Sequence, residues 1–353
     1  DIEVLASPGH TPEHVSYVFR DGERAPALFS GGSLIAGGAA RTDLIDPSIT
    51  DRLTRAMYQT LTRVFADLPD ETRLLPTHGG GSFCSIGSTS RSATTIGDER
   101  RSNPLLAVPS EDQFAKWFPT TFPSAPAYFF RMRSLNRSGP RLRSSIPDPP
   151  TLGPTEFEEA AGTALVVDVR SFSDYAAGHV PGSLSNPFRS SFAVWLGWLA
   201  PPQTSLAFVT EVTPIETVVE ESLLVGYEDF AGWLAGGISA WERDGKPLAR
   251  SNVVDPTETT RLLQKGAIAL DVREPSEVAA GRIPGAMNIP LGELSERIGE
   301  LPNTPIIAYC GHGERASSAI SVLERAGFQE LAILPGGFEA WKESRSGTIQ
   351  APD

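Results

Sequence analysis

The residues best suited to covalent chemistry form a short loop that begins at Cys310 and ends at Arg315. The residues between them are Gly311, His312, Gly313 and Glu314. A cysteine attacks as its thiolate, and backbone N–H groups at the start of a helix stabilise such an anion. The two glycines leave the thiol unscreened, and the arginine adds positive charge. This pattern favours a reactive thiol over a buried cysteine that only packs.

A strand and a helix must position this loop. An apolar run at 306–309 precedes the thiol, and a segment with helical periodicity follows at 315–326. The apolar stripe of that helix consists of Ala316, Ala319, Ile320, Leu323 and Ala326. Further strands at 268–272 and 331–334 and a helix at 256–265 alternate with these elements. The alternation predicts a parallel sheet with helices on both faces.

The second half of the chain is an internal repeat with a period of about 100 residues, the size of a domain. The matching segments are 164–170 with 267–273, 177–182 with 280–285, and 236–241 with 336–341. We therefore predict tandem copies at 151–250 and 251–345. In the first copy Thr210 falls at the thiol position and Ile215 at the arginine position, so this copy is predicted to be an inactive scaffold or docking surface. His179, also in this copy, is predicted to be a turn residue.

Composition restricts the partners. The 353 residues carry a net charge of −13, which argues against nucleic acid or an anionic membrane as a partner. No apolar run reaches the roughly 18 residues of a membrane span. The two cysteines, Cys84 and Cys310, fall in different predicted domains, so we expect no disulfide framework and a cytoplasmic setting. Small-molecule partners fit this composition, and a homo-oligomer stays open.

Residues 1–145 differ from the repeats, because they are rich in Gly, Thr and Ser turns and contain three of the five histidines. The Pro-rich stretch at 138–155 is typical of a linker. Asp1 lies at the edge of an expected strand rather than at an initiating Met. We therefore expect that the N-terminal part of a longer protein is absent.

Both copies resemble the rhodanese (sulfurtransferase) family. The motifs that carry the resemblance are Asp271-Val-Arg273, Glu277 followed by 281–286, the loop 310–315, and 336–341. The resemblance implies that Cys310 takes a sulfane sulfur from a small donor, holds it as a persulfide and passes it to a thiol or cyanide acceptor. It implies that the amides of 311–315 surround the outer sulfur, and that no cofactor is required.

Loop length and charge refine this expectation. The Cys-x4-Arg loop is one residue shorter than the Cys-x5-Arg loop of related phosphatases, so it suits sulfur better than phosphate. Glu314 is unusual beside an anion site, and we hypothesise that it disfavours thiosulfate relative to thiol persulfides. His312 either tunes the thiolate or is a solvated loop residue, and both readings stay open. Asp271 and Arg273 are predicted to form a structural ion pair.

The N-terminal region resembles metallo-β-lactamase-fold proteins. The segments concerned are 7–16, 29–34 and 75–82, and 95–101 and 126–129 resemble the persulfide dioxygenase-like and glyoxalase-II-like branch that is fused to tandem rhodanese domains. The fold class implied is α/β. It comprises a partial metallo-β-lactamase αββα sandwich followed by two rhodanese-like parallel-sheet domains.

The metal site implied by that resemblance is incomplete in this sequence. His10 and His78 match metal ligands, but Gly32 stands at the aspartate position and the His-x-His-x-Asp-His motif is absent. A mono-iron site needs two histidines and a carboxylate, so Fe or Zn is expected only in a complete domain. We predict a sulfurtransferase with an impaired metallo-domain. A non-enzymatic persulfide carrier and a metal-dependent hydrolase or persulfide dioxygenase remain as alternatives.

Overall fold

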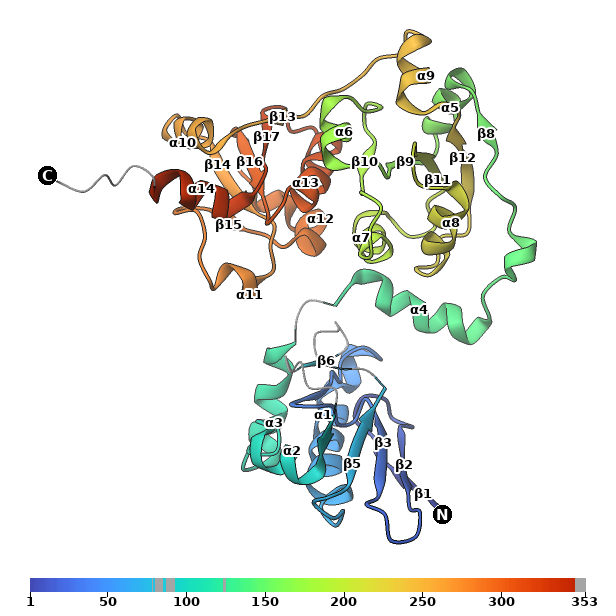
Figure 1. Cartoon of the computed structure of the whole chain (residues 1–353), viewed down its shortest axis with the longest axis vertical. Coiled ribbons are helices and arrows are strands. Elements are labelled where there is room, and N and C mark those ends of the chain that lie inside the picture. The colour runs from blue at the N-terminus through green and yellow to red at the C-terminus, as the bar shows by residue number, and fades with distance from the viewer. Residues whose placement is uncertain (78, 80–84, 87–92, 123–124, 347–353) are drawn as a thin grey trace, which may run out of the picture. The chain divides into compact units, whose positions relative to one another are not determined.

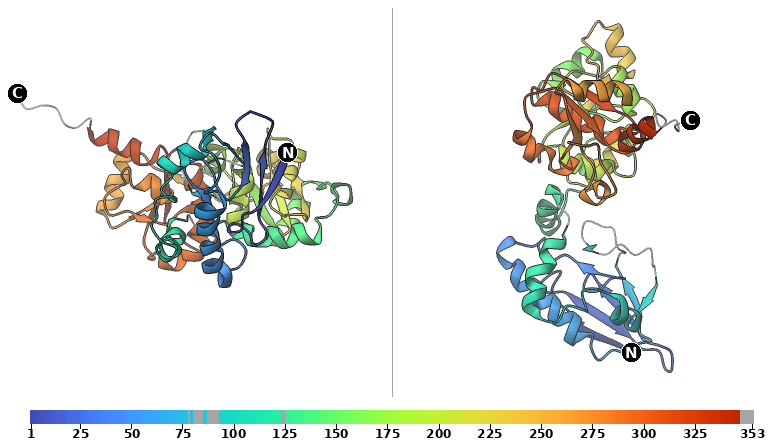
Figure 2. Two further views of the ribbon diagram at one scale, coloured as in Figure 1. Left: turned by 90° about the horizontal axis from the view of Figure 1, so that it is seen from below. Right: turned by 90° about the vertical axis from the view of Figure 1, so that its left-hand side faces the viewer.

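The computed structural model describes residues 1–77, 79, 85–86, 93–122 and 125–346. Contacts between Cα atoms divide the chain into two compact units, Asp1–Phe130 and Arg131–Asp353. Figures 1 and 2 show the elements of both units, coloured along the chain.

The first unit contains a mixed five-stranded sheet. Its strands, in spatial order, are β1 (Ile2–Ala6), β2 (Val15–Phe19), β3 (Ala27–Gly31), β5 (Arg73–Pro76) and β7 (Thr94–Thr95). Only β3 and β5 run parallel, and the other neighbours are antiparallel. A separate two-stranded ladder joins β4 (Ala39–Ala40) and β6 (Ser85–Ile86).

Helices cover one face of this sheet. They are η1 (Pro47–Ile49), α1 (Thr50–Gln59), η2 (Thr60–Val64), α2 (Ile96–Ser102), α3 (Glu111–Trp117) and η3 (Phe118–Thr121). Val18 and Leu28 point to this side and pack with Met57 and Phe114 in one buried cluster. Alternate strand residues, including Tyr17, point to the other face and are exposed. The five-stranded sheet thus has one apolar face under helices and one exposed face.

The second unit contains two parallel five-stranded sheets (Figure 1). The first sheet has the order β10 (Leu184–Ser185), β9 (Leu165–Asp168), β11 (Leu206–Val209), β12 (Phe230–Leu234) and β8 (Thr151–Leu152). The second has the order β15 (Met287–Asn288), β14 (Ile268–Asp271), β16 (Ile306–Tyr309), β17 (Leu331–Leu334) and β13 (Asn252–Val253). The two orders match strand for strand, so the sequence repeat is a repeat of the fold.

Helices flank both sheets. The first copy has α5 (Pro154–Ala161), α6 (Phe172–Ala177), α7 (Phe192–Leu199), α8 (Ile215–Leu223) and α9 (Gly237–Arg243). The second copy has α10 (Pro256–Gln264), α11 (Pro275–Val278), η5 (Leu291–Glu293), α12 (Leu294–Arg297), η6 (Ile298–Glu300), α13 (Glu314–Arg325) and α14 (Gly337–Ser346). The three strands and two helices predicted for the second copy are confirmed within one residue at each end.

The segment between the two resemblances belongs to the second unit. It follows α4 (Ala127–Ser138) and contains η4 (Arg143–Ser145). Arg131 donates a hydrogen bond to the carbonyl oxygen of Val225, and Arg143 forms an ion pair with Glu220. Arg131 thus fastens α4 to the first copy, and Arg143 fastens the Pro-rich stretch to it.

The helix that follows the thiol, α13, is buried on two sides. Its apolar stripe packs on its own sheet. The helical pattern predicts that Ser317, Ser318 and Ser321 face solvent, but all three are fully buried. The Ser185 hydroxyl of β10 bonds to that of Ser317 (2.8 Å), and the Ser185 N–H donates to Ser321 (3.0 Å). The first copy therefore covers the polar side of this helix.

His179 also lies at this interface, so its prediction as a turn residue is wrong. Its ring is fully buried and stacks on Tyr175 with 3.8 Å between ring centres. Its Nε2 lies 3.4 Å from a carboxylate oxygen of Glu324 in α13. One residue along the helix, Arg325 donates to the carbonyl oxygen of Gly182 (2.7 Å). A sequence pattern cannot show burial that another domain provides.

Candidate active site

Cys310 lies directly after β16 and before α13, at the carboxyl edge of the second sheet. Its side chain is 2 % exposed, and its Sγ accepts a hydrogen bond from the N–H of Gly313 at 3.1 Å. Gly313 has φ +133°, a conformation that side chains rarely adopt. An amide at the start of a helix thus points at the sulfur, which is the arrangement that stabilises a thiolate.

The Gly336-Gly337 turn packs against the backbone of the loop that begins at Cys310. Gly337 has φ +56°, and a Cβ atom there would overlap the carbonyl oxygen of Cys310. Gly336 also places its N–H 3.5 Å from the carbonyl oxygen of His312. The side chain of His312 is exposed, so the geometry leaves both readings of this residue open. Glycine is needed at 337 because the backbone of the turn contacts the backbone of the Cys310 loop with no space for a side chain between them.

Arg315 is held beside the thiol by a carboxylate that the sequence did not assign to it. Its two terminal nitrogens donate to the two oxygens of Glu277 at 2.6 and 2.8 Å, and Glu277 also accepts the N–H of Glu274 at 3.0 Å. The hydrogen bond from Arg315 lowers the pKa of Glu277. Burial alone would lower the pKa of Arg315, but Glu277 and the neighbouring Cys310 outweigh it and raise that pKa. The guanidinium is therefore a fixed positive charge.

Asp271 and Arg273 form the predicted ion pair, away from the sulfur. The Arg273 side chain donates to both oxygens of the buried carboxylate, at 2.9 and 2.7 Å, and to the carbonyl oxygen of Gly281 at 2.8 Å. The first copy, which lacks the thiol, builds the same clamp from Asp168, Arg170 and Gly178. A clamp that both copies carry serves the fold rather than the chemistry.

The corresponding loop of the first copy presents the opposite polarity. Thr210 follows β11, and its hydroxyl donates to the carbonyl oxygen of Thr213 at 2.6 Å. Pro214 has no N–H, and Ile215 begins α8. A cavity of about 260 Å³ remains beside this loop. At this loop the first copy presents the carbonyl oxygen of Thr213, an acceptor, where the second copy presents the N–H of Gly313, a donor. The loop of the first copy contains no thiol.

Of the predicted metal ligands of the first unit, the structure describes His10. The Nδ1 of His10 lies 2.8 Å from the carbonyl oxygen of Arg41. A Cβ atom at Gly32 would lie 2.9 Å from the Cβ of Ala40 and 3.0 Å from the His10 ring, so a carboxylate has no room there. His78 lies outside the described residues. Within those residues no group of three or more potential metal-binding side chains occurs, and the donors present do not fit a two-histidine, one-carboxylate iron site.

His14, next to this region, is engaged in hydrogen bonds. Its Nε2 accepts the N–H of Gly32 at 3.2 Å, and its Nδ1 lies 2.8 Å from the Ser7 hydroxyl and 3.0 Å from that of Ser33. Burial and the nearby His10 lower the pKa of His14. The ring is thus a neutral polar link between loops.

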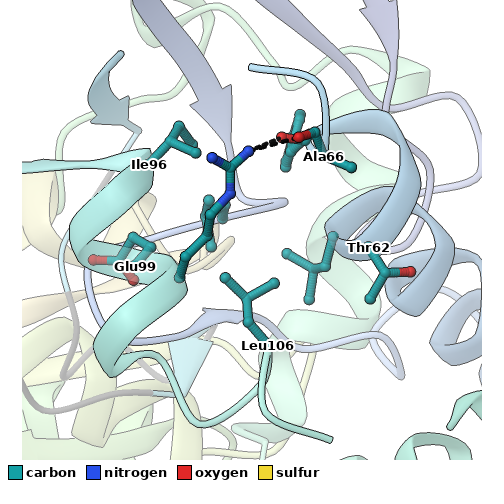
Figure 3. Close-up of a pocket in the computed structure, with 9 residues that line it drawn as sticks. Thr62, Ala66, Ile96, Glu99 and Leu106 are labelled. Carbon is teal, nitrogen blue, oxygen red and sulfur yellow. Dashed lines mark hydrogen bonds between the residues drawn. The ribbon is translucent and has the colours of Figure 1, made fainter. Parts of the chain in front are cut away.

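A separate cavity of about 270 Å³ lies in the first unit (Figure 3). Mostly apolar side chains line it, and the labelled ones are Thr62, Ala66, Ile96, Glu99 and Leu106. The Glu99 carboxylate is buried and accepts hydrogen bonds from Thr94, Gly37 and Asn103. Because both carboxylate oxygens already have protein donors, we assign no chemistry to this cavity.

Comparison with known proteins defines the class to which the described fold and site belong. The rhodanese-like domain model matches residues 154–244 and 255–344, just over half of the chain. The chain belongs to the rhodanese family, with two rhodanese-like domains in tandem. Within the described residues, no helix combines the length and apolar character of a membrane span.

Two curated relatives match one domain's length of the chain. Uncharacterized protein YqhL of Bacillus subtilis is 39% identical over 85 residues, which is 24% of this chain and 68% of that protein. Thiosulfate sulfurtransferase GlpE of Ectopseudomonas mendocina is 33% identical over 90 residues, which is 25% of this chain and 83% of that protein. The name of the second relative, thiosulfate sulfurtransferase, supports sulfur transfer at the level of the family.

One solved structure matches a large share of the chain. The metallo-β-lactamase of Staphylococcus aureus subsp. aureus COL superposes with a TM-score of 0.55 at 26% identity. The match covers 66% of this chain and 66% of that one, just under two thirds of each. The chain therefore combines a metallo-β-lactamase-like unit with tandem rhodanese-like domains, as the resemblances implied.

Proposed function

We propose that this protein is a sulfurtransferase that carries sulfur on Cys310. The observation that supports this proposal best is the hydrogen bond from the Gly313 N–H to the Cys310 sulfur, at the start of α13. The fixed guanidinium of Arg315 adds to the same positive field. Amides and a guanidinium around one sulfur suit an anion that gains and loses a second sulfur atom.

The reaction has two displacement steps. The Cys310 thiolate attacks the sulfane sulfur of thiosulfate or of a thiol persulfide, forming an S–S bond. The bond from that sulfur to the rest of the donor breaks, and sulfite or a thiolate leaves with the electron pair. A thiol or cyanide then attacks the outer sulfur, and Cys310 leaves as the thiolate that began the cycle. The amides of 311–315 would surround the outer sulfur, and no cofactor takes part.

The first unit is assigned no independent activity in this proposal. Its described donors do not fit an iron site, so sulfur transfer is expected to proceed unchanged in the presence of a metal chelator. A reduced thiol carrier also favours the cytoplasmic setting. Should sulfur transfer require added iron or zinc, the metal-dependent alternative would gain support.

The deciding experiment compares wild type with Cys310→Ser, using thiosulfate and glutathione persulfide as donors and cyanide as acceptor. We expect repeated turnover in wild type and none in the variant, because a neutral hydroxyl cannot replace a thiolate as sulfur carrier. Mass spectrometry should find an added sulfur atom on Cys310. Labelling of Cys310 without turnover would instead indicate a persulfide carrier that needs a partner protein.

A further inference from the structure

The first copy contributes a charged side chain to the mouth of the catalytic loop. Arg189 lies between β10 and α7 of that copy, and its Nη1 is 3.3 Å from Oε1 of Glu314. The guanidinium also lies over the Trp195 ring, 5.3 Å from its centre. The Arg189 side chain is 43% exposed and that of Glu314 is 27% exposed, so solvent reaches the pair.

Glu314, one half of this ion pair, lies four residues after Cys310 in the chain. Glu314 is the first residue of α13 and follows Gly313, whose N–H is bonded to Cys310. The ring of Phe172, in α6 of the first copy, lies 3.0 Å from the position a Cβ would take at Gly313. Figure 1 shows α13 beside α6 and β10. The inactive copy thus forms one wall of the loop.

Charge at this wall bears on which donor can approach. A carboxylate at the start of α13 opposes an anion that approaches Cys310, and the opposition is strongest for a dianion whose charge adjoins the sulfur. Thiosulfate is such a donor, whereas the carboxylates of glutathione persulfide lie several bonds from its sulfur. Arg189 compensates the Glu314 charge.

We propose that Arg189 of the catalytically inactive copy is a specificity-determining residue, which lets small dianionic donors reach Cys310 by neutralising Glu314. This inference rests on the proposed sulfurtransferase function and gives the first copy a role in it. It also revises the expectation from sequence, because Glu314 acts as one half of a pair rather than as a lone repelling charge.

The test is a double-variant cycle with Arg189→Gln and Glu314→Gln. The measured quantity is the ratio of kcat/KM for thiosulfate to kcat/KM for glutathione persulfide. We expect Arg189→Gln to lower this ratio about five-fold and Glu314→Gln to raise it, as for one charge near a partly exposed site. The double variant should return close to the wild-type ratio, since both charges are gone. Added salt should shrink the effect of Arg189→Gln.

Arg325→Gln is the matched control. It removes the same charge and one hydrogen bond between the copies, at the far end of the same helix. Its ratio should equal that of wild type. The proposal is overturned if Arg189→Gln lowers both donors equally, which would make Arg189 only a structural contact. It is also overturned if the double variant keeps the lowered ratio of Arg189→Gln, which would mean that Glu314 is not the charge that Arg189 neutralises.

A second measurement does not depend on turnover. Alkylation of Cys310 is followed by peptide mass spectrometry with anionic iodoacetate and neutral iodoacetamide. Arg189→Gln should lower the rate with iodoacetate relative to the rate with iodoacetamide, whereas Arg325→Gln should leave this ratio unchanged. If wild type transfers no sulfur, the proposed function fails while this ratio still decides the role of Arg189. Equal ratios in wild type and Arg189→Gln would contradict it.

Discussion

The two rhodanese-like copies share one architecture and differ where chemistry would take place. Their sheets have the same strand order, and both keep an Asp-x-Arg clamp that is bonded to a glycine carbonyl. The copies part at the loop after the third strand of each sheet, which begins with Cys310 in one and Thr210 in the other. The residues that both copies share maintain the fold, and those that differ at this loop are the ones we propose to act on sulfur.

The difference is one of polarity as well as of nucleophile. Three residues after Cys310, Gly313 directs an N–H at the side chain, whereas three residues after Thr210, Thr213 directs a carbonyl oxygen at it. An anion is stabilised by the first arrangement and repelled by the second. The first copy therefore lacks both the thiol and the N–H donor that the second copy presents at this loop.

The largest expected effect comes from moving the thiol between copies. The double variant Thr210→Cys/Cys310→Ser should stay inactive, at least about 1,000-fold below wild type, because the new thiol would face a carbonyl oxygen. Steady-state sulfur transfer to cyanide measures this. Turnover by the double variant within about 100-fold of wild type would show that the thiol alone, and not the loop, distinguishes the copies.

The next effect concerns the arginine that only the second copy holds. Arg315→Gln should lower kcat/KM for both donors by about 10- to 100-fold, because a partly buried, charge-assisted pair with Glu277 is lost. Glu277→Gln should lower it less, since the guanidinium remains. The control is Arg261→Gln on the exposed side of α10, for which activity should equal that of wild type. If Glu277→Gln proves as damaging as Arg315→Gln, orientation rather than charge is the decisive contribution.

A matched pair of glycines tests how the two loops are supported. In Gly337→Ala the new methyl group overlaps the Cys310 carbonyl, whereas in Gly237→Ala it meets the flexible side chain of Glu211. Both residues have positive φ, so both variants carry that strain. We expect losses of about 3 kcal/mol for Gly337→Ala and about 1 kcal/mol for Gly237→Ala in urea unfolding. Equal losses would mean that the backbone contact at Cys310 relaxes freely.

The smallest expected effect is the pH dependence of stability that Glu274 contributes to the second copy. The first copy has Ser171 at the matching position, which does not titrate. Burial raises the pKa of Glu274, so the folded state disfavours its ionised form and loses stability as pH rises above about 4.5. Glu274→Gln should therefore unfold at a higher temperature than wild type at pH 7 and at the same temperature near pH 4. Glu277, whose pKa is lowered, should give the opposite sign: Glu277→Gln destabilises at pH 7, and the difference shrinks as pH falls. A Glu274→Gln effect that is independent of pH would refute this account.

Much of the second copy follows from its sequence. Runs of β-branched residues beside a helical stripe fix the strands and α13, and glycines around a lone cysteine mark the loop. What the sequence could not give are contacts between distant segments. Glu277 belongs to a recognisable motif, yet nothing in the spacing pairs it with Arg315. The serines on α13 predict a face in contact with water, and only the structure shows that the first copy covers that face.

The first unit shows the same limit from the other side. The motif around His10 was visible in the sequence, and so was the glycine at the aspartate position. The crowding of Gly32 by Ala40 and by the His10 ring appears only in three dimensions. That packing leaves no space in which a substituted carboxylate could be restored without moving its neighbours.

The serine contacts between the copies have a consequence for synthesis. The ribosome releases the first copy before α13 has been made, so β10 is already folded when the helix emerges. Ser185 bonds to Ser317 and Ser321 of that helix, whereas the Ser318 hydroxyl donates to the carbonyl oxygen of Glu314 within the helix itself. We therefore expect the first copy to act as a template on which the second copy folds within a single chain. A protein that lost this copy in evolution would also need new side chains on α13.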